Sequence, residues 1–589
     1  MLACAGKLSA AASSRCAVLV GKQPLTISHK RWLYTLWLVL VCGFALLHAF
    51  HLGADFPNHT PWFMDWAKYT DEGWYGDAAV RAHLFGAWYL QGDFNPAPAV
   101  PVWPFMEWVL FFFTGVTLEA ARGLAVGFFF CNLLLSYLLL RTRGQRWVAM
   151  LALTLIVTSP FLYCFSRLAI LEPMLIAFTL AALNLAVRLP RFRRPVVASI
   201  AIGLLFTLMM LTKTTAVFLL PALGWAMLLP LWQKRRLAGS SFRPWCDKLA
   251  KCCVVAAAAA FAASFGLWMA LVIHFGFMAD FKYLFFINKY KKPTEFYWPV
   301  LSFWWSFHGG LWVDHFLIPL ASLIILCAIV AGMALARRKA GGPSDGSSPT
   351  GWNAWAGKLL LDPVFGSSIL AIAGYILFMT CQNHPQPRYF AVVAFFSFFI
   401  VAQGAGALFS QTRPGRESWP HRLGWAVVGL VSLAAVSNGF QILNYATHPE
   451  YTFVEAAERL TQYIDAHPNG NRLLVSISGD QITLATHLPT LCDDFGTPSS
   501  TYPDLPSKLA HYQPGWWATW NDIDPGTLED LHTRFSLEQV AIFRAFDDPE
   551  RNVLVLFKLH PLPGGRVRSS GDKSLQIPLP GDKIDIPVE

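Results

Sequence analysis

Apolar segments of about 20 residues recur along this chain, and they constrain its fold more than any other feature. A membrane-spanning helix needs about 20 consecutive apolar residues. With a window of that length, we predict spans at residues 32–52, 120–140, 147–165, 173–188, 195–212, 214–232, 250–273, 312–335, 364–381, 389–409 and 422–443. Hydrophobic residues make up 55% of the 589 and charged residues only 14%. The sequence therefore predicts a polytopic α-helical membrane protein with about eleven transmembrane helices.

Short clusters of Lys and Arg between these segments indicate the orientation of the chain. Cytoplasmic connections of membrane proteins carry an excess of basic residues, and here every second connection is basic. The basic connections are 141–146, 188–194, 234–236, 337–339 and 413–422. This alternation predicts a cytoplasmic N-terminus over residues 1–31 and a C-terminus outside the cytoplasm. The N-terminus shows no compact apolar core followed by a small-residue cleavage site, which predicts an uncleaved first span. It also assigns the net charge of +10 to membrane topology, not to nucleic-acid binding.

The same topology places four loops of the predicted membrane domain, residues 32–445, on the outer side. These loops cover residues 53–119, 166–172, 274–311 and 382–388. A further apolar stretch, Trp103 to Val116, lies within the first loop, but about 14 residues is short for a span. We therefore predict an interfacial helix there.

The composition changes after about residue 446. An amphipathic helix is predicted first and three strands follow it. The helix covers 455–466 and the strands cover 472–478, 540–544 and 553–558. This pattern predicts a small α/β domain over residues 446–562, outside the cytoplasm. Segment 563–589 is rich in Gly, Pro and charge, which predicts a disordered tail.

Charged and aromatic side chains collect in the predicted outer connections. The first loop contributes Asp71, Glu72, Tyr75 and Arg81. The other outer connections contribute Arg167, Glu172, Lys213, Lys289, His308, Arg388 and Tyr389. Carboxylates and cations at one face suit a reaction between an anionic, lipid-borne donor and a hydroxyl group. A carboxylate can accept the proton of the hydroxyl, and Lys and Arg can bind a phosphate leaving group.

Each of these residues also has a purely structural explanation. Arg167, Lys213 and Arg388 stand at the ends of predicted spans, where long cationic side chains commonly reach the lipid headgroups. Glu172 precedes Pro173, a pattern typical of a helix start. The cysteines lie mostly inside apolar segments and form no CxxC pair, so they predict neither a disulfide framework nor a zinc site.

The order of these motifs resembles the GT-C superfamily of polyprenyl-phosphate-sugar-dependent glycosyltransferases. Within it, the chain is most similar to the bacterial branch of aminoarabinose lipid A transferases and protein O-mannosyltransferase relatives. The segments that carry the resemblance are Thr70 to Tyr75, Gly92-Asp93, Pro96 to Pro104, Ser166 to Pro173, Leu211 to Thr214 and Pro387 to Tyr389. They follow the order of the family across about residues 30–410.

The resemblance implies an inner-membrane enzyme with a membrane-embedded cavity for the lipid carrier and a periplasmic C-terminal domain. It implies an inverting transfer of a sugar from polyprenyl phosphate to a lipid, glycan or protein acceptor. Asp71 would be the base, and Glu72 and Glu172 would orient the acceptor or bind a divalent metal ion if one is needed. Arg167, Lys213 and Arg388 would bind the donor phosphate. Other substrate contacts are predicted for Tyr75, Arg81, Lys289, His308 and Tyr389.

Two other functions fit a charged cavity in a membrane. A transporter or flippase of lipid-linked sugars would tend to show internal repeats and broken helices near mid-membrane. This sequence shows no internal repeat and gathers its charges at one face. A catalytically inactive relative that binds the lipid or assembles an envelope complex stays open, because the family usually has Asp at the position of Glu172.

Overall fold

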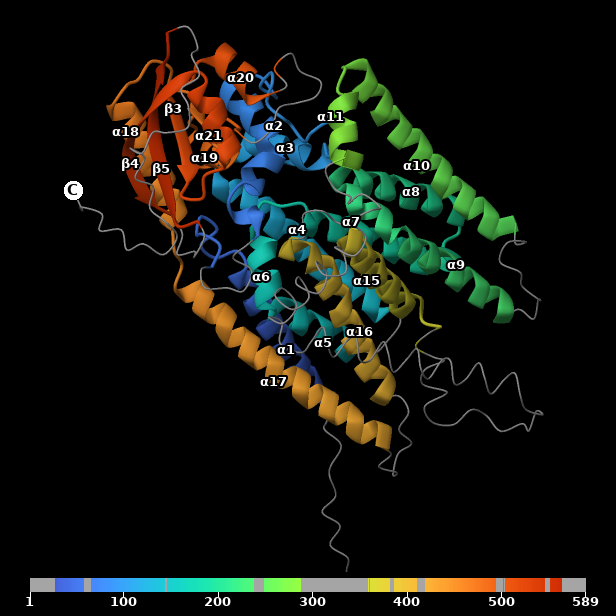
Figure 1. Ribbon diagram of the computed structural model, residues 1–589. Coiled ribbons are helices and arrows are strands. Elements are labelled where there is room, and N and C mark those ends of the chain that lie inside the picture. Colours follow the sequence, from blue (N-terminus) through green and yellow to red (C-terminus); the bar gives the residue numbers. More distant parts are fainter. Residues whose placement is uncertain are drawn as a thin grey trace, which may run out of the picture.

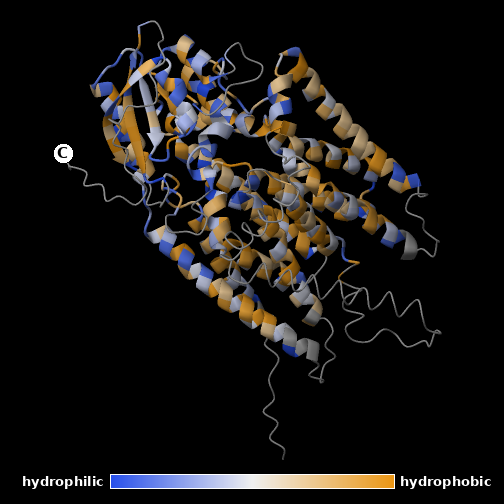
Figure 2. Ribbon diagram, viewed as in Figure 1, coloured by the Kyte–Doolittle hydropathy of each residue, from blue (hydrophilic) through white to orange (hydrophobic). Residues whose placement is uncertain are grey.

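The computed structural model describes residues 27–57, 65–142, 146–237, 248–287, 359, 361–381, 386–409, 419–493, 502, 504–545 and 551–563. Long apolar helices form a bundle, and a mixed helix-and-sheet unit covers one end of it (Figure 1). Hydrophobic residues dominate the bundle, whereas the covering unit mixes hydrophobic and hydrophilic residues (Figure 2). Among the described residues, eight helices are long and apolar enough to cross a membrane, and a bent pair would make a ninth span.

Ten of the eleven predicted spans correspond to helices of the bundle. These helices are α1 (Ile27–Leu47), α4 (Leu118–Arg141), α5 (Arg146–Val157), α6 (Pro160–Arg167), α7 (Glu172–Arg188), α8 (Pro195–Thr212), α9 (Leu220–Leu237), α10 (Lys248–His274), α15 (Pro363–Cys381), α16 (Ala391–Phe409) and α17 (Trp419–Thr447). Two short 3₁₀ helices, η3 (Thr214–Leu219) and η9 (Pro387–Phe390), precede α9 and α16. The predicted span 312–335 lies outside the described residues.

Two predicted spans differ from the structure in shape. The first ends at Leu47 instead of residue 52, and His51 in the turn after it has φ 51°, which a continuing helix does not allow. The predicted span 147–165 consists of α5 and α6, which are bent by 68°. Ser159 accepts a hydrogen bond from the Leu162 backbone N–H at 3.1 Å, and Pro160 begins α6, so a new helix starts at this point.

An outer layer lies between the bundle and the sheet (Figure 1). It contains η1 (Trp66–Lys68), α2 (Asp71–Phe85) and α3 (Val102–Thr114). Farther from the sheet, α11 (Met278–Lys282) and the π-helical η5 (Tyr283–Ile287) follow α10. The 13-residue α3 corresponds to the predicted helix at 103–116 and is too short to span a membrane. It packs against α2 on one side and α4 on the other.

The C-terminal unit contains a five-stranded sheet with the order β2-β1-β3-β5-β4. Its elements are α18 (Thr452–Ala466), β1 (Leu474–Val475), α19 (Gly479–Thr486), β2 (Thr490–Leu491), α20 (Leu505–Tyr512), β3 (Trp516–Trp520), α21 (Pro525–His532), β4 (Phe535–Arg544) and β5 (Val553–Pro561). β1 runs parallel to β2 and β3, whereas β5 is antiparallel to β3 and β4. The sequence missed β3, because all five of its residues are buried and the strand shows no polar alternation. The predicted disordered tail lies outside the described residues from position 564 onward.

Gly73 allows α2 to pack directly on the backbone of α19. A Cβ atom on Gly73 would lie 2.2 Å from the carbonyl carbon of Asp480, and the Gly73 N–H donates to Gln481 Oε1 at 2.9 Å. Such a clash can be relieved only if the C-terminal unit moves away from α2. The membrane part and the C-terminal unit are therefore joined by close backbone packing.

We expect Gly73→Ala to lower the thermal unfolding midpoint of the purified protein. Overpacking typically costs about 1–3 kcal/mol, and this loss should exceed the gain of up to about 1 kcal/mol from replacing a helical Gly. Gly127→Ala is the matched control, because no described atom outside its own helix lies within 4 Å of a Cβ at this position in α4. Equal midpoints for the two variants would show that the close approach at Gly73 does not exist.

Asp55 joins the first outer loop to the start of α18. Its Oδ2 accepts hydrogen bonds from Thr452 Oγ1 at 2.8 Å and from the Phe453 N–H at 2.9 Å. Burial raises the pKa of Asp55 to about 6, although the Phe453 hydrogen bond opposes the shift. Between its ordinary value of 3.8 and about 6, the folded state therefore holds a proton that the unfolded state has released.

The contribution of Asp55 to stability should consequently fall as the pH rises from about 4 to about 6 and stay low above that window. Asp55→Asn removes this titration and keeps an acceptor for the Phe453 N–H. We expect the difference in thermal unfolding midpoint, Asp55→Asn minus wild type, to increase across this pH window and then to stay constant. Thermal unfolding of both proteins between pH 4 and pH 8 measures the difference, and parallel curves would contradict the expectation.

Candidate functional site

Four polar segments meet where the outer layer contacts the bundle. Asp71 begins α2, Glu172 begins α7, Lys213 separates α8 from η3, and Arg388 lies in η9. Acidic residues favour helix N-termini because the backbone N–H groups there carry partial positive charge. Breaks between apolar helices also leave room for polar side chains that a continuous span would exclude. The outer ends of these elements therefore bring together residues that lie up to 317 positions apart, from Asp71 to Arg388 (388 − 71).

Arg388 is the centre of this cluster. Its guanidinium group forms ion pairs with both Asp65 and Asp71. Asp65 also accepts the backbone N–H of Arg388 on Oδ2 at 2.8 Å, so it fixes both the main chain and the side chain of this residue. The Nε atom of Arg388 lies 4.0 Å from Glu172 Oε1. With only 3% of its surface exposed, Arg388 does not extend to the lipid headgroups.

Lys213 is fully buried and forms an ion pair with Glu172. Its ammonium group lies 4.4 Å from the centre of the Tyr389 ring, and the Arg388 guanidinium lies 5.1 Å from the same centre. The negative face of an aromatic ring attracts cations, so Tyr389 and Glu172 together hold Lys213 inside the protein. The burial of Lys213 and Arg388 excludes the headgroup explanation for both residues.

Asp71 differs from the other carboxylates of the cluster in its exposure. Its side chain is 13% exposed, compared with 1% for Asp65 and 1% for Glu172. Thr70 Oγ1 donates a hydrogen bond to Asp71 Oδ1 at 3.1 Å. Tyr75 lies one turn later and is buried; burial raises the pKa of Tyr75, so its hydroxyl keeps its proton at neutral pH. Asp71 is therefore the most exposed of these three carboxylates.

Glu72 belongs to a different network, although it is the neighbour of Asp71. Adjacent residues of a helix point about 100° apart. Glu72 pairs with Arg122 through two contacts of 2.7 and 2.6 Å, and it accepts the Ala169 N–H at 2.8 Å and Gln481 Nε2 at 3.0 Å. Its carboxylate thus ties α2 to α4, to the loop before α7 and to α19. The structure does not bring it together with Glu172.

Arg167 is also separated from Lys213 and Arg388. Its guanidinium donates to the Phe50 and His51 carbonyl oxygens at 2.6 Å each and to the Tyr163 hydroxyl at 2.5 Å. These bonds satisfy the carbonyl groups of the turn that follows α1. The observed geometry therefore gives Arg167 a role in holding this turn.

Arg81 contributes to an ionic cluster between the outer layer and the C-terminal unit. It donates to Asp77 at 2.6 and 2.8 Å and contacts Asp93 at 3.4 Å and Asp480 at 3.2 Å, while Lys508 contacts Asp93 at 3.3 Å. Burial raises the pKa of Asp480 well above its ordinary value, and the nearby Asp77 adds to the rise. This cluster therefore joins the outer layer to the C-terminal unit through buried ion pairs.

Three residues that matter for this geometry escaped the sequence analysis: Asp65, Arg122 and Gln481. The sequence could have identified Arg122, because a charged residue near the start of a predicted span is energetically unfavourable and is usually paired with an opposite charge. Asp65 and Gln481 stand in segments without a motif, and only the tertiary structure identifies them. The predicted contacts Lys289 and His308 lie outside the described residues.

The described residues include no group of three or more His, Cys, Asp or Glu side chains that could hold a metal ion. Asp65 and Asp71 are paired with Arg388, and Glu172 is paired with Lys213. Each of these carboxylates thus already has a cationic partner. The divalent metal ion stays a prediction, and no step below depends on it.

Comparisons with known proteins agree with this architecture. The dolichyl-phosphate-mannose-protein mannosyltransferase family matches residues 105–285, less than a third of the chain. A sequence comparison with curated proteins finds no match.

Among solved structures, ArnT from Cupriavidus metallidurans bound to undecaprenyl phosphate matches with a TM-score of 0.54 and 14% identity, covering 89% of this chain and 98% of that one. The archaeal oligosaccharyltransferase AglB from Archaeoglobus fulgidus, in complex with an inhibitory peptide and a dolichol-phosphate, matches with a TM-score of 0.46 and 11% identity. That match covers 86% of this chain and 73% of AglB. The helical bundle, the outer layer and the terminal sheet give this chain the fold of ArnT, and the long apolar helices of the described part are those of a multi-pass membrane protein.

Proposed function

We propose that this protein is a membrane glycosyltransferase that moves a sugar from a polyprenyl-phosphate-linked donor to a hydroxyl group outside the cytoplasm. The observation that carries the proposal is the placement of one partly exposed carboxylate, Asp71, beside the buried cations Arg388 and Lys213. A base and a phosphate-binding pair are the two components that this transfer needs. The fold shared with ArnT and the partial match to the mannosyltransferase family support the same reaction class.

The transfer is a single displacement at the anomeric carbon. Asp71 accepts the proton of the acceptor hydroxyl, and the hydroxyl oxygen forms a bond to the anomeric carbon. The bond between that carbon and the phosphate oxygen breaks, and its electron pair leaves with the polyprenyl phosphate. Arg388 and Lys213 stabilise the negative charge that develops on this phosphate, because buried cations interact strongly with an anion in a medium of low dielectric constant.

The charge balance of the site indicates how the donor enters. Among the described residues, the ion pairs of Asp65, Asp71 and Glu172 involve two cations, Lys213 and Arg388, so the ionised cluster carries one net negative charge. An anionic phosphate would be repelled unless a cation exchanges its partner. We infer that Arg388 keeps Asp65 and turns from Asp71 to the phosphate. This exchange frees Asp71 to act as a base only when a donor is bound.

The cellular setting is part of the proposal. The basic connections of the sequence favour a cytoplasmic N-terminus, and the odd number of predicted spans would put the C-terminal unit on the opposite side. In a bacterial cell this corresponds to the inner membrane, with the sheet in the periplasm. Glu72 and Arg122 would then hold α2 in place, and the acceptor would be a lipid, a glycan or a protein.

The proposal is tested by incubating the purified protein with a panel of labelled polyprenyl-phosphate sugars and membrane extract as the source of acceptors. We expect one donor to yield a glycosylated product together with free polyprenyl phosphate, and Asp71→Asn to yield neither. A transporter or flippase of lipid-linked sugars would instead move labelled donor across proteoliposomes without consuming it. Such movement without product would overturn the proposal.

A further inference from the structure

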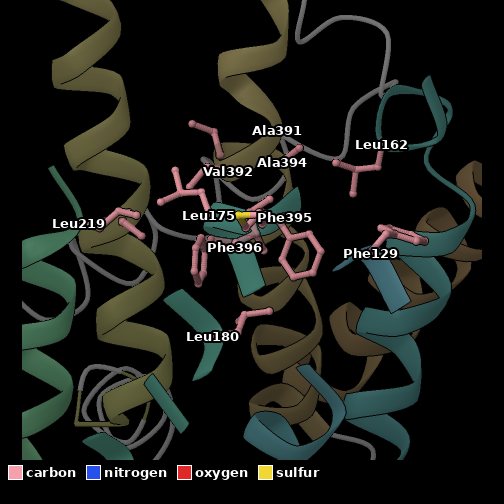
Figure 3. Close-up of a cluster of buried hydrophobic side chains, with 14 of the residues drawn as sticks. Phe129, Leu162, Leu175, Leu180, Leu219, Ala391, Val392, Ala394, Phe395 and Phe396 are labelled. Carbon is pink, nitrogen blue, oxygen red and sulfur yellow. The ribbon is translucent and has the colours of Figure 1, made fainter. Parts of the chain in front are cut away.

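A small cavity is lined by Glu172 but not by its partner Lys213. Its volume open to the centre of a water molecule is about 10 Å³, which is enough for one water. Most of its wall is apolar, and Figure 3 shows four of the side chains that form it, Phe129, Leu162, Ala391 and Phe395. Three polar residues, Asn132, Ser166 and Glu172, also line it.

Two acceptor atoms in this wall have no hydrogen-bond donor among the described residues. They are Oε2 of Glu172 and Oδ1 of Asn132, and both are buried. The other ends of these side chains are fixed, because Glu172 Oε1 pairs with Lys213 and Asn132 Nδ2 donates to the Pro173 carbonyl at 2.9 Å. A buried acceptor without a donor is destabilising, and more so when it is charged. The two orphaned atoms therefore favour a ligand that donates two hydrogen bonds.

Ser166 does not supply either bond. Its Oγ lies 2.7 Å from His48 Nδ1. His48 Nε2 lies 3.4 Å from the Val157 carbonyl, which only accepts, so the ring proton belongs on Nε2. Nδ1 is then an acceptor, and the Ser166 hydroxyl donates to it.

We propose that one structural water molecule occupies this cavity and donates its two hydrogen bonds to Glu172 Oε2 and Asn132 Oδ1. Water fits in size, and its two donors match the two acceptors. The water holds the Glu172 carboxylate with Oε1 turned toward Lys213 and Arg388. Asn132, which lies on α4 and touches neither cation, is thereby a positioning residue for the phosphate-binding pair. The positioning role of Asn132 rests on the proposed function, whereas the water site itself does not.

The water is tested directly by a cryo-electron microscopy map of the full-length protein in lipid nanodiscs, at a resolution that shows other buried waters. We expect a density peak within hydrogen-bond distance of both Glu172 Oε2 and Asn132 Oδ1. An empty cavity in a map that resolves other buried waters would overturn the proposal. This outcome does not depend on whether the protein transfers a sugar.

The role of Asn132 is tested by the affinity for undecaprenyl phosphate. Asn132→Leu removes the acceptor, and Asn184→Leu is its matched control. Asn184 is also a buried Asn that donates across the α4–α7 contact, to the Leu135 carbonyl at 3.0 Å, but it does not line the cavity. Without Asn132 Oδ1 the water loses one of its two acceptors and no longer fixes the Glu172 carboxylate, so we expect Kd to rise about fivefold to tenfold for Asn132→Leu and less than twofold for Asn184→Leu.

A second pair of variants tests the cavity without changing its polar residues. Ala391→Val adds two methyl groups to the wall, and Ala394→Val adds the same groups at a buried position of α16 outside it. We expect only Ala391→Val to weaken undecaprenyl phosphate binding, although both can lower the thermal midpoint. Equal changes in Kd within both pairs would overturn the positioning role. Normal binding by all variants, with a wild type that fails to transfer sugar, would count against the proposed function as well.

Discussion

Replacing Asp71 with Asn is expected to lower sugar transfer by roughly 10²–10⁴-fold, the usual contribution of a general base. An alcohol is a poor nucleophile at neutral pH, and the amide of Asn keeps the shape of the side chain without its basicity. Arg388 retains its ion pair with Asp65 in this variant, so the fold should persist. Binding of undecaprenyl phosphate should stay normal or become tighter, because Arg388 no longer has to leave Asp71. Transfer rates and lipid titrations of the same preparation measure both effects.

Glu72→Gln is the matched control, because it removes the neighbouring carboxylate. Glu72 is completely buried and neutralises Arg122, so its loss should lower the thermal midpoint. The folded fraction of this variant should keep a transfer rate closer to the wild-type value than Asp71→Asn does. If Glu72→Gln lost transfer while Asp71→Asn kept it, the assignment of the base to Asp71 would be wrong.

Replacing Lys213 with Met is expected to destabilise the protein by about 3–5 kcal/mol, the usual cost of leaving one partner of a buried ion pair alone. Lys213 and Glu172 are each 1% exposed, so solvent water cannot stabilise the negative charge of Glu172 once Lys213 is removed. The double variant Lys213→Met with Glu172→Gln removes both charges and should recover most of this loss. Neither variant should bind undecaprenyl phosphate normally, because the phosphate loses a cation in both.

The comparison of these two variants separates stability from function. Thermal unfolding midpoints report the ion pair, and titration with undecaprenyl phosphate reports the phosphate contact. Recovery of the midpoint without recovery of binding supports the assigned role. If the double variant bound undecaprenyl phosphate normally, Lys213 would stabilise the fold without contacting the phosphate.

Much of the membrane architecture could be predicted from sequence, because a span must satisfy its backbone internally and exclude charge over about 20 residues. Helices α4, α7, α8 and α15 begin and end within a few residues of the predicted limits. The bend between α5 and α6 was missed, since a uniformly apolar stretch hides a new cap at Ser159. The fully buried β3 was missed for a similar reason, because burial of both faces removes the alternation that marks a strand.

The candidate site was predicted in part. Asp71, Glu172, Lys213 and Arg388 stand at helix ends, where a polar residue signals either a cap or a function, and the structure brings them together. Glu72 and Arg167 carry the same signal but serve separate networks. Residue type and position do not reveal which of two adjacent carboxylates faces a partner from a distant loop. That choice depends on Asp65 and Arg388, which meet only in the folded chain.

The anomeric configuration of the product tests the central claim most directly. A single displacement, with Asp71 as the base and the phosphate held by Arg388 and Lys213, inverts the configuration at the anomeric carbon. With a donor of known anomeric form, nuclear magnetic resonance of the product should show the opposite form. Retention would require a covalent intermediate on a second carboxylate such as Glu172, and it would contradict the proposed reaction.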